Sequence, residues 1–398
     1  MSQQRVGIIG EQLHRQPPGG IGVYIRSLLR ALAEPSGHSS EGLTAELIVS
    51  RGLVLAETES IPQSIRVRTL FTPHRLTVEL VHRGLPLLNR SKALRGIDLL
   101  HATSLDLLPS DQPLTAFVHD LLWRSWPQAY SARGIEWHER SLRRLIDRAQ
   151  VLMVPSYAVA RELVGAGAAE DSVHVVGEGS DHLPLLPRTV GDNVGQDSPH
   201  GQQGQPGPSG MAPYLLSVAT AQPRKNLAGL LEGYCVYRSR HMAQGPVDVD
   251  GPLRLKLVGP VGWGPQLPTL PEGVEAVGNV TDEQLATLYA GAAALVVVPF
   301  AEGYGLPVVE AWRAGTPVLC SSGVPVGSEH ADAALVVDDV EDAESIAVAI
   351  DELLADGEAT ARRVAIGKQT AEALTWSAVA RHHQELWFAA LRQSRGQQ

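Results

Sequence analysis

Residues 296–310 read VVVPFAEGYGLPVVE: an apolar run, a glycine-containing turn and the start of a helix. The run that ends at Val298 predicts a buried strand. Pro307 suits the first turn of a helix, because its missing N–H would be unpaired there in any case. Gly303 and Gly305 let the backbone approach a ligand closely. Backbone N–H groups and the positive end of the helix dipole then face outward, so this turn predicts an anion site, with a diphosphate as the expected ligand.

The same alternation of short apolar runs and helical patterns extends in both directions from this segment. Strands are expected at residues 6–9, 45–50, 99–101, 115–119, 151–154, 173–176, 214–218, 254–258, 274–276, 294–298 and 318–320. Helices are expected at residues 20–33, 133–149, 158–166, 226–237, 282–290, 306–314 and 343–354. Strands that alternate with helices indicate a parallel sheet covered on both faces.

Residues 190–213 interrupt this pattern. They are rich in Gly, Pro, Gln and Ser and show no apolar periodicity, which predicts a flexible linker. The sequence therefore indicates an α/β protein with two Rossmann-like domains that face a cleft, at residues 1–189 and 214–375. Apolar residues at helical spacing in residues 376–398, two tryptophans among them, predict a last helix that crosses back to the N-terminal domain across the junction.

Composition excludes several classes of protein. The chain has 398 residues, a hydrophobic content of 44% and only two cysteines, Cys235 and Cys320. These values fit globular domains in a reducing compartment and argue against a disulfide-based scaffold. No apolar stretch approaches the roughly 20 residues that span a bilayer, and no signal peptide is recognised. A cytoplasmic location is expected.

The charge is unevenly distributed. A net charge of −10 argues against nucleic-acid binding, but residues 66–95 hold seven basic residues against one acid, Glu79. Further arginines follow in residues 124–148. Two interpretations are open: a solvated helix face, or a surface for an anionic partner such as a lipid headgroup, with peripheral contact at the inner face of a membrane.

Two carboxylates flank the expected anion site. Glu302 precedes the glycines and Glu310 lies in the helix that follows. A phosphate repels carboxylates, so their useful role there is to accept hydrogen bonds from hydroxyls, Glu302 from a sugar and Glu310 from a ribose. Taken singly, each has a plainer explanation, Glu302 as a surface acid and Glu310 as a helix cap.

The E-x7-E spacing, in the form PFAEGYGLPVVEAWRAGTPVL, resembles the retaining glycosyltransferase family 4, which has the GT-B fold. The resemblance covers nearly the whole chain except residues 190–213. It implies a donor site for a nucleoside diphosphate sugar in which Gly303, Tyr304, Gly305 and Leu306 contact the donor and Glu302 is catalytic.

Other motifs match the same family. Arg224 and Lys225, in SVATAQPRKNL, resemble the turn that clamps the donor diphosphate. This sequence departs from the family at Ala219, usually a glycine, and at Thr220, an arginine in some members. Gly20, in PPGGIGVY, resembles the glycine loop whose backbone contacts the donor phosphate or the acceptor.

A histidine ends an expected strand in the first half, in FVHDL. The resemblance implies that His119 approaches the donor sugar and that Asp120 orients the imidazole, although a lone histidine is more often structural. It also implies that Gly259 and Val280 lie in loops that hold the nucleotide base, mainly through backbone.

The resemblance implies transfer of a hexose to a hydroxyl of a glycan or lipid-linked acceptor, and the PRKN form of the turn, with His119 and Asp120, resembles branches that use GDP-mannose. UDP-dependent glucosyl or N-acetylglucosaminyl transfer is the alternative, and a non-catalytic subunit that binds sugar nucleotides is another. A dinucleotide-dependent oxidoreductase is disfavoured because the G-x-G-x-x-G fingerprint is missing. No metal is expected, because Asp248 and Asp250 form a D-x-D only within a Gly- and Pro-rich loop and no Cys/His spacing suits zinc.

Overall fold

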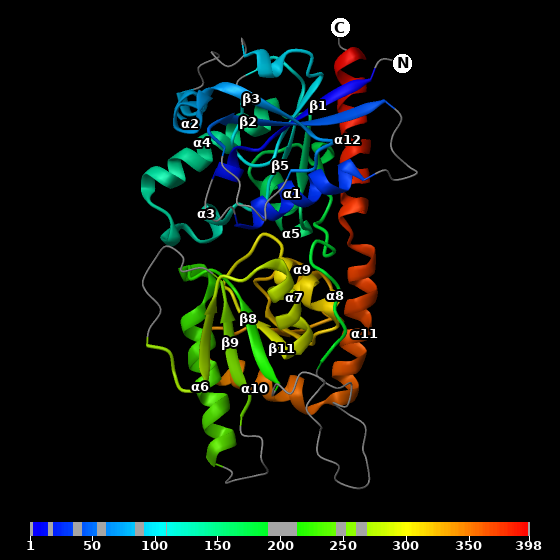
Figure 1. Ribbon diagram of the computed structural model, residues 1–398. Helices are drawn as coiled ribbons and strands as arrows, with labels where there is room; N and C mark the ends of the chain where they lie inside the picture. The colour runs from blue at the N-terminus through cyan, green and yellow to red at the C-terminus, as the bar shows by residue number, and fades with distance from the viewer. Residues whose placement is uncertain are drawn as a thin grey trace. The chain divides into compact units, whose positions relative to one another are not determined.

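The computed structural model describes residues 3–14, 19–34, 42–53, 61–83, 91–108, 110–189, 213–243, 252–259 and 269–396. The chain forms two compact units, one of Met1–Gly179 with Trp376–Gln398 and one of Ser180–Thr375 (Figure 1). The expected linker lies outside the described residues except for Pro213, as does the D-x-D at Asp248 and Asp250. Residues 180–189 belong to the second unit and not to the first, since the Thr189 N–H donates to the carbonyl of Ala290 at 3.0 Å.

Within the described residues, the first unit holds a seven-stranded sheet in the order β3-β2-β1-β4-β5-β6-β7, with every neighbouring pair parallel. Its strands are β1 (Gln4–Ile9), β2 (Leu43–Arg51), β3 (Arg66–Pro73), β4 (Leu99–Ala102), β5 (Leu114–Phe117), β6 (Val151–Val154) and β7 (Val173–Val175). Its helices are η1 (Glu11–His14), α1 (Gly19–Ala33), α2 (His74–Arg83), η3 (Lys92–Leu94), α3 (Leu122–Ser125), η4 (Pro127–Ala129), α4 (Ala132–Arg148), α5 (Tyr157–Gly165), η5 (Glu170–Ser172) and α12 (Trp376–Gly396).

The described part of the second unit repeats this plan with six parallel strands in the order β10-β9-β8-β11-β12-β13. They are β8 (Tyr214–Val218), β9 (Arg254–Val258), β10 (Val274–Gly278), β11 (Ala292–Val297), β12 (Val318–Ser321) and β13 (Leu335–Val337). The helices are η6 (Pro223–Lys225), α6 (Leu227–Ala243), α7 (Asp282–Gly291), α8 (Leu306–Ala314), α9 (Pro325–Glu329), α10 (Ala343–Ala355) and α11 (Gly357–Ala373).

Each sheet has an apolar core on both faces, because successive side chains of a strand point to opposite sides. In β8, Leu216 packs with residues of α7 and α8, whereas Leu215 packs with residues of α6 and α10. In the first unit, Ile8 faces α1 and α12 and Ile9 faces the opposite core. The two expected parallel Rossmann-like sheets are thus confirmed.

The sequence missed two strands. A solvated helix face is one of the two interpretations given above for residues 66–95, but residues 66–73 form the edge strand β3, and the helices α2 and η3 follow it. Arg68 of this strand is partly buried; it pairs with Glu46 and donates to the carbonyl of Arg95 at 2.7 Å. In β3 the side chains alternate between the inside and the outside of the unit, but its arginines obscure this alternation in the sequence. Strand β13, which has three residues, was also missed.

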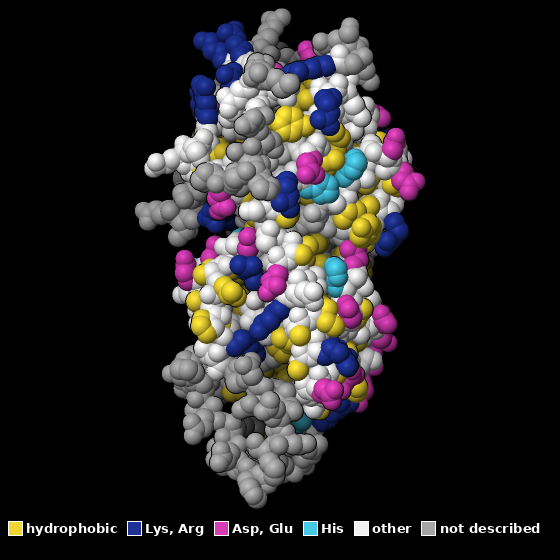
Figure 2. All heavy atoms as spheres, turned by 90° about the vertical axis from the view of Figure 1, so that its right-hand side faces the viewer, with side chains coloured by type: hydrophobic (Ala, Val, Ile, Leu, Met, Phe, Trp, Pro, Cys, Tyr) yellow, Lys and Arg dark blue, Asp and Glu magenta, His cyan; other side chains and the backbone are white. Residues whose placement is uncertain are grey.

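Many of the remaining arginines in the basic stretches are engaged within the first unit. Arg124 donates from two nitrogens to Glu139 at 2.6 Å each, and Arg140 pairs with Glu136 one helical turn away. Figure 2 shows basic and acidic side chains interspersed over the visible face. Among the described helices, none is long and apolar enough to cross a membrane.

The last helix belongs to the first unit, as expected. Figure 1 shows α12 beside α1, and the two helices are in contact. Trp387 and His383 of α12 are fully buried in the same core as Tyr24 of α1.

A chain of hydrogen bonds crosses this contact, and one pair of ring tautomers satisfies it; the Thr115 hydroxyl also lies 3.0 Å from His101 Nδ1. His383 Nδ1 lies 2.8 Å from the carbonyl of Val379, so Nδ1 carries hydrogen and Nε2 accepts from the Tyr24 hydroxyl at 2.7 Å. The hydroxyl, having donated, accepts from His101 Nε2 at 3.0 Å. His101 Nδ1 then accepts from Trp387 Nε1 at 3.3 Å. Both imidazoles are neutral in this arrangement.

We predict that this network makes the first unit sensitive to acid. Burial lowers the pKa of His383 from 6.5 to about 4 and also lowers the pKa of His101. The unfolded chain therefore binds protons at a higher pH than the folded chain, and stability falls as pH drops from 6.5 towards 4, by on the order of 3 kcal/mol for His383 alone.

Thermal unfolding between pH 7.5 and 4.5 tests this against His383→Gln, which cannot titrate. The variant should lose less melting temperature on acidification than the wild type. Parallel losses in both proteins would contradict the prediction.

Candidate functional site

A pocket opens in the second unit where the order of its strands reverses. The chain leaves β8 towards one side of the sheet and leaves β11 towards the other, which separates the two following loops. The pocket encloses about 340 Å³, part of it open to solvent. Its lining comes from the ends of β8 and β11, from η6 and from the start of α8, and comprises Ser217, Val218, Ala219, Lys225, Val297, Val298, Pro299, Glu302, Gly305, Pro307, Val308 and Val324.

Glu302 lies in this pocket between two cations. One carboxylate oxygen accepts from Arg224 Nη1 at 2.9 Å, and the other accepts from Lys225 Nζ. Burial by itself would raise the pKa of Glu302, but the charges of Lys225 and Arg224 outweigh it and hold that pKa below its usual value. Glu302 is therefore ionised at neutral pH.

The backbone holds these residues together. The Phe300 N–H, just beyond β11, donates to the carbonyl of Arg224 at 2.9 Å and joins the η6 turn to the loop that carries Glu302. Asn226, which ends η6, has a left-handed backbone with φ of 51°. Its amide donates to the Val340 carbonyl at 2.9 Å, which anchors the turn.

The N-terminus of α8 forms one wall. Gly305 caps the helix with φ of 117°, and a Cβ there would lie 2.4 Å from Val324, so both conformation and space require glycine. Pro307 stands in the first turn of α8, as predicted. Gly303 is buried and Tyr304 packs into the core. Leu306, the first residue of α8, is partly buried.

The two loops expected to hold a base lie at neighbouring strand ends. Gly259 follows β9 with φ of 140°, and a Cβ would lie 2.2 Å from the carbonyl oxygen of Ala219. Its N–H donates to the carbonyl of Gly278 at 3.0 Å. Val280 is partly buried just beyond, before α7.

Glu310 is buried in α8 and is not among the residues that line the pocket. It accepts from Tyr289 at 2.6 Å and from His182 Nε2 at 2.9 Å. Burial lowers the pKa of His182, but the hydrogen bond and charge of Glu310 outweigh burial and raise that pKa above 6.5. The sequence did not single out His182, and a ribose contact by Glu310 stays a prediction.

In the first unit, His119 lies just past β5. Its Nδ1 is 3.2 Å from Glu178, and its Nε2 is 3.1 Å from the carbonyl of Thr103. Asp120 was expected to orient this imidazole, but the contacts correct that interpretation: Asp120 accepts from the N–H of Leu122 at 3.2 Å, and Glu178 faces the ring. The only sequence signal for Glu178 is its position between two glycines after β7.

His119 and Asp120 line a second pocket of about 510 Å³, which lies wholly in the first unit at its own strand-order reversal between β1 and β4. Its walls combine aromatic and acidic side chains, and the remaining lining is Gln12, Ile21, Ser104, Leu105, Asp106, Phe117, Val118, Trp123, Trp137 and His138. Gly20 lies exposed in the first turn of α1.

Two doubly covered parallel sheets, each with a pocket at its strand-order reversal, are typical of proteins that bind nucleotides and their sugars. The comparisons with known proteins specify the class. Residues 18–182 match the model for glycosyltransferase family 4, and residues 267–371 match the model for glycosyl transferases group 1. The chain belongs to glycosyltransferase family 4 and has the GT-B fold.

Among curated relatives, the chain is 29% identical to the O-antigen chain mannosyltransferase B of Escherichia coli over 65% of this chain. The matched part spans 66% of that protein. The chain is also 31% identical to the serotype-specific mannosyltransferase WbdA of Escherichia coli, over 36% of this chain and 17% of that relative.

The fold resembles solved structures of low sequence identity. Sucrose-phosphate synthase from Thermosynechococcus elongatus aligns over 100% of both chains with a TM-score of 0.70 and 20% identity. The Anabaena protein HepE, in complex with UDP-glucose, aligns over 97% of this chain and 100% of its own with a TM-score of 0.63 and 15% identity.

We predict that the contact between His182 and Glu310 stabilises the second unit more at low pH than at high pH, which is the opposite of the pH dependence expected for His383. A raised pKa in the folded state means that the stabilisation is fully present below pH 6.5 and declines as pH rises through the folded pKa. His182→Ala leaves a buried carboxylate without its cation, which should cost about 3 kcal/mol near pH 6 and less near pH 9.

Thermal unfolding at both pH values checks this. His182→Gln is the matched control, since its amide still donates to Glu310 but does not titrate. A loss in His182→Ala that is equal at pH 6 and pH 9 would show that packing, and not charge, is responsible.

Proposed function

We propose that this chain transfers a hexose from a nucleoside diphosphate sugar to a hydroxyl of a glycan or lipid-linked acceptor, with retention of configuration. The observation that carries the proposal is the Glu302 carboxylate held between Arg224 and Lys225, beside the N-terminus of α8, within one pocket. This arrangement offers positive groups to a diphosphate and an acceptor of hydrogen bonds to a sugar.

Stabilisation of the leaving group is the main proposed role of the pocket. Charge accumulates on the diphosphate as the bond to the sugar breaks. Lys225, Arg224 and the first turn of α8 present positive charge and backbone dipoles to it in a partly enclosed space, where electrostatic interactions are stronger than in water. Gly303, Tyr304, Gly305 and Leu306 supply the backbone of that wall, and Gly259 and Val280 that of the base loops.

Glu302 is proposed to position the sugar. Each carboxylate oxygen has two lone pairs, and the contacts with Arg224 and Lys225 leave acceptor capacity for sugar hydroxyls. Because its pKa is lowered, Glu302 is not suited to donate a proton as a general acid. Its two cationic neighbours also reduce its strength as a nucleophile, which agrees with a front-face process that has no covalent intermediate.

Mannose from GDP-mannose is the proposed donor. The names of the Escherichia coli relatives describe mannosyltransferases, and O-antigen assembly suggests a polysaccharide acceptor. UDP-sugars remain the alternative, since HepE was solved with UDP-glucose. The base contacts are expected to be mainly backbone, so the side chains of this site do not discriminate between the bases.

The first-unit pocket is proposed to bind the sugars that take part in the reaction. Trp123 and Trp137 offer apolar faces to sugar rings, and Asp106 and Asp120 offer acceptors to hydroxyls. His119, which lies in the wall of this pocket beside Glu178, is proposed to contact the donor sugar. Gly20 is proposed to contact the donor phosphate or the acceptor.

Peripheral contact with an anionic membrane is proposed for β3 and α2. Val67, Phe71 and Leu76 are exposed by 45%, 56% and 46%, beside the exposed Arg66 and Arg75. Val67 and Phe71 share one face of β3, because they stand four residues apart on a strand. Apolar side chains bordered by arginines suit the interface of an anionic bilayer.

A screen of the full-length protein by thermal shift against GDP-mannose, UDP-glucose, UDP-N-acetylglucosamine, ADP-glucose and dTDP-glucose tests the donor. We expect GDP-mannose to raise the melting temperature most, because binding to the folded state stabilises by mass action. A response to UDP-sugars alone would overturn the mannosyl assignment and leave the transferase class intact.

Two variants separate diphosphate binding from sugar positioning. Lys225→Ala should weaken nucleoside diphosphate binding and lower transfer by about 100-fold or more. Glu302→Gln should lower transfer to a similar degree but bind the free nucleoside diphosphate at least as tightly as wild type, because a negative charge beside the phosphates is removed. Wild-type turnover in either variant, measured with purified acceptor, would refute the proposed site.

Flotation with vesicles tests the membrane contact. Phe71→Ser combined with Arg75→Glu should bind vesicles containing anionic lipid roughly tenfold more weakly than wild type. Leu185→Ser, which replaces a side chain exposed by 62% in the second unit, is the control and should bind as wild type does. Equal binding by all three proteins would exclude β3 and α2 as the contact.

A further inference from the structure

Glu11, His14 and His74 form a cluster that neither pocket includes. Glu11 and His14 lie in η1, which follows β1, and His74 opens α2, which follows β3. Because all strands of this sheet are parallel, both segments emerge at the same edge. His74 is 63 positions from Glu11, so the sequence spacing gave no sign of the cluster.

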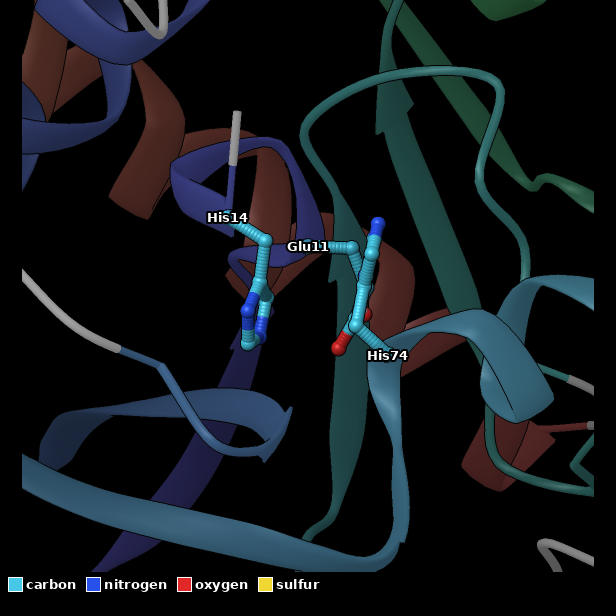
Figure 3. A group of neighbouring side chains, drawn as sticks. All are labelled: Glu11, His14 and His74. Carbon is cyan, nitrogen blue, oxygen red and sulfur yellow. The ribbon is translucent and has the colours of Figure 1, made fainter. Parts of the chain in front are cut away.

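Local geometry places Glu11 and His14 together. In a 3₁₀ helix, residues three apart lie directly above one another, so both side chains leave η1 on the same side. Glu11 Oε2 is 2.7 Å from His74 Nδ1, and the rings of His14 and His74 stack at 4.5 Å with an angle of 16°. Figure 3 shows the two rings side by side with the carboxylate against His74.

The donor atoms of the three residues lie within 4.8 Å of one another. Atoms at this separation can reach a common ion at bond lengths of about 2.0–2.2 Å after small side-chain rotations. Two imidazoles with one carboxylate are also the ligand set of zinc sites that keep a further position for water.

The surroundings support each ligand differently. Glu11 is 2% exposed, and the N–H and hydroxyl of Ser50, at the end of β2, each donate to it at 2.7 Å. These bonds fix the carboxylate, as outer partners commonly do at metal sites. His14 Nε2 is buried and has no hydrogen-bond partner among the described residues, which leaves a nitrogen available to an ion.

We propose that Glu11, His14 and His74 bind one divalent transition-metal ion of the zinc type. A metal lies in the plane of each imidazole that binds it, and parallel rings cannot share an ion. Binding therefore requires one ring to turn. The His74 side chain is 31% exposed, so we assign the turn to this ring, and His14 is partly buried at the end of η1.

The ion would tie η1 to the start of α2. Gln12, next to Glu11 in the same turn, lines the first-unit pocket with Asp106 and His119. Metal binding would thus fix one wall of that pocket without taking part in chemistry. The inference does not depend on the proposed donor, because the ligands are separate from the glycosyltransferase site.

Isothermal titration of the full-length, chelator-treated protein with Zn²⁺ tests this. Wild type should bind one ion per chain. His74→Ala, His14→Ala and Glu11→Gln should each bind at least about 100-fold more weakly, since each removes one of three ligands. Titration with Co²⁺ should produce visible absorption in wild type that is lost in the same variants.

His241→Ala is the matched control. His241 is 41% exposed and lies 2.8 Å from Asp351 in the second unit, and no third metal-ligating side chain joins this pair among the residues that the structure describes. It should leave the stoichiometric site unchanged. Circular dichroism and melting of the metal-free proteins establish that the variants fold. His74→Ala changes a partly exposed side chain, so it tests the proposal even if His14→Ala does not fold.

Absence of one-to-one binding in wild type would overturn the proposal. So would stoichiometric binding that persists unchanged in His14→Ala combined with His74→Ala. Both results can be read without any assay of sugar transfer, so the failure of this proposal and the failure of the proposed function are distinguishable.

Discussion

Parallel pairing of the strands is the constraint on which both units depend. A chain that pairs neighbouring strands in parallel must cross back over a face of the sheet between them, usually through a helix, so the carboxyl ends of the strands gather at one edge of each sheet. At that edge the strand order reverses between β8 and β11 and between β1 and β4. Residues distant in sequence meet there, such as Lys225 with Glu302 and Glu11 with His74.

Charges in these units are accommodated by specific partners. Glu302 stays ionised in a partly enclosed pocket because Arg224 and Lys225 both reach it, and Glu310 is buried because Tyr289 and His182 satisfy it. A buried carboxylate without such partners would be costly. The two glutamates of the E-x7-E motif therefore differ in environment: Glu302 borders open space, and Glu310 also fastens α8 to α7.

The last helix joins the first unit through polar as well as apolar contacts. Trp376 and Trp387 contribute buried area to the core of α1, while the Tyr24, His101 and His383 network links α1, β4 and α12 in one hydrogen-bonded arrangement. An apolar face alone tolerates rotation of a helix, whereas a network with one consistent set of protons requires one orientation. Burial keeps the two histidines neutral, because it lowers the pKa of each.

The sequence by itself determined the fold class and predicted several of the residues that line the second-unit pocket. Apolar runs that alternate with helical patterns predicted two parallel sheets. Gly305, Pro307 and the Arg224–Lys225 turn predicted the position of the pocket, because the backbone conformation of a turn or of a helix start depends on the residue types at that point of the chain. It missed β3, whose arginines concealed the alternation, and the partners Glu178 and His182. Only the tertiary structure decided those partners and the Glu11, His14 and His74 cluster, because strand order, and not distance along the chain, sets which loops meet.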